Sequence, residues 1–373
     1  MQDFRSALDS LVSIGSPDDP AARPLVLRVL VDLFAQRPYH APVEVAQFEE
    51  IVSRLVEKAD AQTCALVAAR LAAHDCAPPE LLAKLARLSV DAAVCVMGSA
   101  GVVSPARLAA AAAWGPPEVA AAVARRTDLE PALIAALAMR AERDIALALA
   151  GNAAAALSPA DRRALAARAR DDGQLARALL ARPDGALCPA LFLHADESQR
   201  GAIIVAAGRA ALGEAAPGRR MRPPQPLDAA RAARLEAAAL RQDAVALAQL
   251  LMDVWPMTTS AATRIVSDPG GEPLAVALAA MALEETLLER ILVFLAAGDG
   301  ASLARYDRLR ALALGLRPAL ALRLVEAFAG LPESPARPQH RSALDPAPTA
   351  GERRPRATVV ALERRDGRAV DRA

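Results

Sequence analysis

Few side chains in this sequence have the types and spacing that chemistry requires. The histidines are scattered, at His40, His74, His194 and His340, so a zinc site would need ligands from distant segments. No H-E-x-x-H, phosphate-loop or G-x-S-x-G motif occurs. The segment Gly298-Asp299-Gly300 lacks the third glycine and the preceding strand of a dinucleotide site, which predicts an interhelical turn there. We therefore expect no catalytic residues, no metal, no cofactor and no enzyme activity.

One local pattern could accept a phosphoryl group. His74-Asp75, followed by Pro78 and Leu81, is similar to the phosphoacceptor box of histidine kinases, in which an exposed imidazole on a helix is phosphorylated. No ATP-binding segment rich in Asn and Gly follows it. A histidine near a helix C-terminus, where its charge suits the helix dipole, is the structural alternative. A phosphorelay component with His74 as the acceptor therefore stays as one functional hypothesis.

Arginines gather in the middle of the chain and could form a binding surface. They lie at Arg125, Arg126, Arg162, Arg163, Arg168, Arg170, Arg177 and Arg182. Acidic residues are interspersed among them, whereas phosphate binding favours uncompensated positive charge. Nucleic-acid binding is thus a second alternative, and a polar protein-binding face is the preferred interpretation. We place that face at Arg125, Arg126 and Arg182.

The bulk composition predicts helices, and the near-zero net charge gives the protein no strong overall electrostatic field. Hydrophobic residues make up 54% of the chain and aromatics only 3%, with alanine and leucine, which favour helix, dominating. The 44 basic residues nearly balance the 43 acidic ones, for a net charge of +1. Such a balance recruits neither nucleic acid nor an acidic membrane surface.

Cysteine spacing and the chain's apolar segments bear on the compartment. The cysteines, at Cys64, Cys76, Cys95 and Cys188, show no C-x-x-C spacing, so we expect small buried thiols in a reducing compartment. Asp3 and Asp9 stand where a secretory signal would need a basic end and an apolar core. The longest uncharged windows fall short of the roughly 18 apolar residues that a membrane span needs. The sequence predicts a cytoplasmic protein.

Three amphipathic segments open the helical pattern, at residues 24–36, 43–58 and 61–74. In the first, Leu27, Leu30, Val31 and Phe34 recur at the i, i+3, i+4, i+7 spacing of a helix with one buried face. We interpret residues 1–75 as an N-terminal helical cap.

The next region, residues 76–214, is repetitive. Its prolines, Pro79, Pro105, Pro131, Pro159 and Pro189, are separated by 26, 26, 28 and 30 residues, and proline is tolerated at the first turn of a helix. A second apolar landmark follows each of the first four prolines, which predicts a helix pair per repeat. Because such a pair cannot bury its apolar face alone, we expect an α-solenoid, in which neighbouring pairs complete the core.

The remaining boundaries follow from breaks in the helical pattern. Residues 215–226, rich in proline and arginine, predict a linker. Residues 227–330 predict a C-terminal helical domain, including one helix over 274–297. Residues 331–373, dense in proline and charge, predict a disordered tail.

Several segments together resemble a known family, a bacterial helical-repeat group catalogued as a domain of unknown function. They read LVDLFAQR at 30–37, LVEKADAQTCALVAARLA at 55–72, ARRTDLEPALIAALAMR at 124–140, AGNAAAALSPADRRALAARA at 150–169 and IVSDPGGEPLAVALAAMAL at 265–283. The resemblance spans roughly residues 24 to 330, and the repeats also resemble HEAT-like and leucine-rich-repeat-variant solenoids. It implies a fold and no activity.

The prediction is therefore an all-α protein that works as a scaffold or regulatory adaptor by binding an unidentified protein partner. Shape and charge complementarity would be its mechanism. The sequence indicates neither the partner, the pathway nor the oligomeric state.

Overall fold

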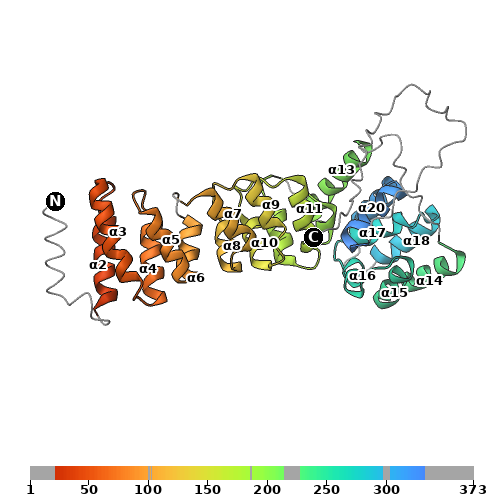
Figure 1. Ribbon diagram of the computed structural model, residues 1–373. Helices are drawn as coiled ribbons and strands as arrows, with labels where there is room; N and C mark the ends of the chain where they lie inside the picture. The colour runs from red at the N-terminus through yellow and green to blue at the C-terminus, as the bar shows by residue number, and fades with distance from the viewer. Residues whose placement is uncertain are drawn as a thin grey trace, which may run out of the picture. The chain divides into compact units, whose positions relative to one another are not determined.

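The computed structural model describes residues 22–99, 101, 103–184, 187–213, 227–296 and 303–331. Every regular element in these residues is a helix, so the chain is all-α as predicted; Figure 1 follows the helices from α2 in red to α20 in blue. None of the described helices combines the length and the apolar character needed to cross a membrane. The predicted linker, the tail beyond Leu331 and Gly298-Asp299-Gly300 lie outside the described residues.

The first helices form where their amphipathic patterns predict them. Their bounds are α2 Arg23–Ala35, α3 Pro42–Val56 and α4 Ala61–Ala72. Phe34 of α2 stacks on Phe48 of α3, with ring centroids 4.0 Å apart, and both side chains are buried. Asp60 starts α4 because its carboxylate accepts from the Thr63 amide at 2.8 Å.

The repeat prolines begin helices, as predicted, at all five positions. The pairs are α5 Pro79–Leu88 with α6 Val90–Ser99, α7 Pro105–Trp114 with α8 Pro117–Ala124, α9 Pro131–Ala138 with α10 Arg143–Gly151, and α11 Pro159–Ala169 with α12 Gly173–Leu180. The helix that begins at Pro189 is the short 3-10 helix η1 (Pro189–His194) and not an α-helix. Asp196, which accepts from the Gln199 amide at 2.8 Å, starts a new helix directly afterwards.

Equivalent helices of successive pairs pack on one another. The first helices are in contact as α7 with α9 and α9 with α11, and the second helices as α6 with α8, α8 with α10 and α10 with α12. The N-terminal helices continue the second row, since α2 contacts α4 and α4 contacts α6. Small side chains permit this approach: the residues of α8 from Val119 to Ala124 are all buried, and four of the six are alanine.

The C-terminal helices enclose a core of their own around α17. They are α13 Glu197–Gly213, α14 Ala229–Leu240, α15 Ala244–Val254, α16 Thr259–Val266, α17 Glu272–Ala280, α18 Glu285–Ala296, α19 Leu303–Gly315 and α20 Pro318–Ala329. Every residue of α17 is buried. The single helix predicted over 274–297 was wrong: the chain turns at Ala282, whose φ of 50° is left-handed, and α18 begins afresh.

Candidate functional site

Two of the three arginines predicted to form a binding face lie inside the molecule. Arg126 and Arg182 each expose only 6% of their surface, whereas Arg125 is exposed. The guanidinium of Arg126 donates to the Met97 carbonyl at 3.0 Å, at the end of α6. The expectation that Arg126 and Arg182 lie on the surface was therefore wrong, and only Arg125 can meet a partner from its present position.

Arg182 repeats this contact two pairs further along the chain. Its Nη1 donates to the carbonyls of Ala150 and Asn152, at 3.2 and 2.7 Å, at the end of α10. Its Nη2 donates to the Ala155 carbonyl at 2.6 Å. Asn152 does the same for α8, because its side-chain amide donates to the Ala124 carbonyl at 2.8 Å.

The first helices of the pairs carry a matching set of contacts. Arg140, at the end of α9, donates from Nη1 to the carbonyls of Ala113 and Gly115, both at 3.1 Å, at the end of α7. Arg168 of α11 donates in turn to the Arg140 and Ala141 carbonyls, at 2.5 and 2.8 Å. The last carbonyls of a helix have no partner within it. These side chains supply one from the next pair.

An acidic residue two positions later holds three of these guanidinium groups. Asp128 pairs with Arg126 at 2.7 Å, Asp184 with Arg182 at 3.0 Å, and Glu142 with Arg140. The hydrogen bond from Arg140 lowers the pKa of Glu142 to about 2. Three of the eight arginines that the sequence offered for phosphate or partner binding, Arg126, Arg168 and Arg182, thus join one helix pair to the next.

The phosphoacceptor hypothesis depends on a ring nitrogen of His74 being accessible. Its Nδ1 accepts from the Cys76 amide at 3.1 Å, and its Nε2 lies 2.8 Å from the Arg37 carbonyl. Because Nδ1 accepts, Nε2 must carry the proton that it donates to that carbonyl. Both nitrogens are therefore bonded, and the ring fastens the end of α4 to the turn after α2.

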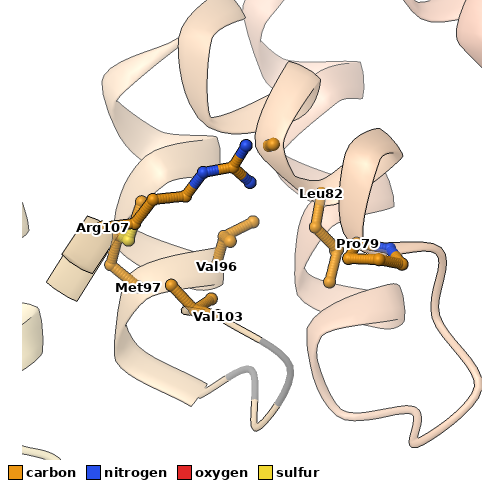
Figure 2. A pocket seen from close by; sticks show the side chains of 7 residues that line it. Pro79, Leu82, Val96, Met97, Val103 and Arg107 are labelled. Atoms are coloured by element: carbon orange, nitrogen blue, oxygen red, sulfur yellow. The ribbon is translucent and has the colours of Figure 1, made fainter. Parts of the chain in front are cut away.

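Other reactive groups show no site geometry. Burial raises the pKa of the Cys64, Cys95 and Cys188 thiols, so none is an activated thiolate. The searched part of the chain, its described residues, holds no cluster of three or more His, Cys, Asp or Glu that could bind a metal ion. A pocket between α5, α6 and α7, lined by Leu82, Val96 and Arg107 among others, has a volume of about 10 Å³, near the size of one water molecule (Figure 2).

An apolar edge is the most unusual surface feature of the repeats. Trp114, the last residue of α7, is 89% exposed, and Met139, directly after α9, is 80% exposed. Arg140, which follows Met139, binds carbonyls on both sides of Trp114, those of Ala113 and Gly115. The two apolar side chains therefore extend from adjacent helix ends. We call Trp114 and Met139 the apolar edge.

Sequence reasoning missed this edge, although a signal was available. In α7 the buried residues are Leu108, Ala111 and Ala112, and Trp114 falls outside their stripe. A tryptophan off the buried stripe, directly before Gly115 and a pair of prolines, marks a large apolar side chain at a helix end. The density of arginines was the stronger pattern in the sequence. It directed the prediction of a binding face to arginines that bind backbone carbonyls between helix pairs.

The repeat helices and the C-terminal helices meet at a partly buried hydrogen-bonded joint. Arg264 of α16 donates to the Arg170 carbonyl at 2.7 Å, and its Nη2 lies 2.8 Å from Nε2 of His194, which is itself 3.0 Å from that carbonyl. Nearby, Arg200 of α13 lies 2.5 Å from Asp268 and 2.7 Å from Glu272, with all three side chains largely buried. The carbonyl at the end of α11 thus receives its donor from the C-terminal helices.

The comparison with known families gives one match. A family model described as an uncharacterised protein conserved in bacteria (DUF2336) matches residues 93–326. This span runs from within α6 to within α20, covers more than half of the chain and includes the apolar edge. No curated protein and no solved structure matches the chain.

Proposed function

The chain belongs to the DUF2336 family of proteins conserved in bacteria, and from that premise we propose that it is a non-enzymatic scaffold or regulatory adaptor that binds other proteins in the cytoplasm. The observation that carries this proposal is the apolar edge. Tryptophan is among the residues that contribute most binding energy at protein interfaces, and methionine adapts its shape to a partner. Two such side chains, exposed at the ends of two helices that pack on each other, suit a protein-binding role.

The rigidity of the support adds to the proposal. The backbone on both sides of Trp114 is fixed by the Arg140 guanidinium, which Glu142 holds in turn. A side chain on a fixed backbone loses less conformational entropy on binding than one on a moving loop. The arrangement supports binding by shape and apolar contact.

The two alternative functions gain no comparable observation. Arg126, Arg168 and Arg182 donate to backbone carbonyls instead of standing free for phosphates. Both ring nitrogens of His74 are hydrogen-bonded. Protein binding is accordingly the function that we advance.

The experiment that tests the proposal compares the apolar edge with apolar surface elsewhere. The protein carrying Trp114→Ser with Met139→Ser is used in affinity purification from its native cell, followed by mass spectrometry. The matched control carries Val245→Ser with Leu212→Ser, at residues that are 69% and 71% exposed on other helices. We expect the first variant to lose at least one partner that the wild type and the control retain, with unchanged helicity by circular dichroism. Retention of every partner by the edge variant would place the binding surface elsewhere.

A further inference from the structure

Acidic residues accompany the apolar edge in successive helix pairs. Glu118 lies in the first turn of α8, directly after the turn that follows Trp114, and Asp144 lies in the first turn of α10, just after Met139. Both side chains are exposed. In the preceding pair, Asp91 holds the same place in α6, and Leu88 and Val90, 41% and 46% exposed, stand at the turn before it.

These carboxylates form no ion pair among the described residues, although Arg143 also interacts electrostatically with Asp144. Among the described residues, Asp91, Glu118 and Asp144 enter no ion pair, whereas the neighbouring Arg140 and Arg143 are paired with Glu142 and Asp172. Their position at helix N-termini stabilises the negative charge. The edge therefore presents apolar side chains next to exposed carboxylates that lie outside any ion pair of the described residues.

The spacing of the stack sets a repeat length for a partner. Packed helices lie about 8–10 Å apart, and an α-helix covers that distance in about six or seven residues. Apolar residues spaced i, i+7 on a partner helix would thus reach Trp114 and Met139 in turn. Basic residues beside them would meet Glu118 and Asp144.

We propose that the apolar edge and its row of carboxylates bind a basic amphipathic helix of a partner protein. This inference rests on the proposed function and adds the chemistry of the partner. Apolar anchors give the contact its affinity, and the carboxylates select a cationic helix over a neutral or acidic one.

Trp114 supplies its own readout for a direct binding test. The chain has two tryptophans, and Trp255 is only 9% exposed, so iodide quenches chiefly Trp114. The probe is a synthetic leucine-lysine amphipathic helix of about 18 residues, or five turns, and its leucine-glutamate counterpart serves as the control peptide. We expect the lysine peptide to shift the emission to shorter wavelength and to protect Trp114 from iodide, and the glutamate peptide to do neither.

Variants then separate charge from apolar contact. Glu118→Gln with Asp144→Asn should weaken binding of the lysine peptide roughly tenfold, the effect of losing two surface ion pairs of ordinary strength. Glu284→Gln with Asp307→Asn makes the same charge change at exposed carboxylates of the C-terminal helices and should leave the affinity unchanged. Equal binding of both peptides, equal affinity of both variants, or failure of the lysine peptide to protect Trp114 would overturn the inference.

Two outcomes distinguish this inference from the proposed function. If Trp114→Ser with Met139→Ser loses its cellular partners while neutralising the carboxylates changes nothing, the edge binds proteins but does not select basic ones. If Trp114 becomes protected from iodide as protein concentration rises without peptide, a second copy of the chain occupies the edge, and the basic helix is the wrong occupant.

Discussion

Arg125 and Arg126 are neighbours in sequence with opposite environments. Arg125 lies in solvent, while Arg126 reaches the end of a helix in the preceding pair, 29 residues earlier. In the local sequence only Asp128, two positions after Arg126, separates them, because the Met97 carbonyl that Arg126 binds leaves no mark on side-chain composition. The contrast supplies a direct measurement of what the inter-pair contact contributes.

Replacing Arg126 with Ala should lower the free energy of unfolding by about 2–3 kcal/mol, because the Met97 carbonyl and Asp128 lose a charged hydrogen-bonding partner. Arg125→Ala, at an exposed site, should change it by no more than about 0.5 kcal/mol. Urea denaturation followed by circular dichroism measures both. Equal effects of the two substitutions would show that the buried contact contributes nothing specific.

His194 makes the joint to the C-terminal helices sensitive to acid. Nε2 of His194 lies 2.8 Å from Nη2 of Arg264 and 3.0 Å from the Arg170 carbonyl, and protonating the ring would bring a second positive charge against Arg264. Burial, together with the charges of Arg264 and Arg177, lowers the pKa of His194 below its ordinary value of 6.5, against smaller opposing contributions from the Arg170 carbonyl and Asp171. The folded protein thus binds fewer protons here than the unfolded chain.

The consequence is a contribution to stability that is present above pH 6.5 and is lost as the pH falls toward and through the folded pKa. Lowering the pH from about 7.5 to 5.5 should therefore reduce the melting temperature more in the wild type than in His194→Gln, which can accept from Arg264 but cannot titrate. Differential scanning calorimetry at several pH values measures this. An identical pH dependence in the two proteins would exclude His194 as the cause.

At the scale of the element, helix starts were the most predictable feature of the fold. Pro79, Pro105, Pro131 and Pro159 begin helices because proline at the first turn loses no hydrogen bond. Helix ends were harder to predict. The break between α17 and α18 has no proline or glycine to mark it, since Ala282 itself adopts the left-handed conformation. The apolar run over 274–297 therefore looked continuous in the sequence.

This break predicts a stabilising substitution. Ala282→Gly removes the steric cost of a left-handed alanine, about 1–2 kcal/mol, which is larger than the roughly 0.4–1 kcal/mol by which glycine's extra freedom stabilises the unfolded chain. We expect a small rise in the melting temperature. Ala279→Gly, inside α17, is the control; it should lower the free energy of unfolding by about 1 kcal/mol, and the melting temperature with it. A decrease with Ala282→Gly would mean that the turn at this position carries no strain.

At the scale of the whole molecule, the contacts between like helices agree with repeated units, and the solenoid itself stays a prediction. The sequence indicated that pairs must stack, because Leu133, Leu137 and Ile145 need neighbours to bury them. It did not indicate that α2 and α4 extend one of the rows, since the residues before Pro79 lack the repeat's prolines. Side-chain identity alone does not encode which pairs touch.

Stacking of this kind predicts unequal stability along the chain. α8 packs on α6, α7, α9 and α10, whereas α2 packs chiefly on α3 and α4 among the described helices. Amides of α2 should exchange with solvent faster than those of α8, by on the order of tenfold or more. Hydrogen exchange with mass spectrometry resolves the two helices. Uniform protection from α2 to α10 would indicate one cooperative unit.

The side chains that donate to carbonyls at helix ends also determine in which direction the array of helix pairs can be extended and where it ends. Arg140 donates to carbonyls at the end of α7, and Arg168 to carbonyls at the end of α9. Each further pair added to the array would leave the carbonyls at its own helix ends without a donor. At the end of α11 the hydrogen-bond donor is Arg264, which lies in the C-terminal helices and belongs to no repeat. The C-terminal helices therefore end the array. An inserted copy of one pair could lengthen it, provided that the last helix of the array still placed a carbonyl within hydrogen-bond distance of Arg264 and His194.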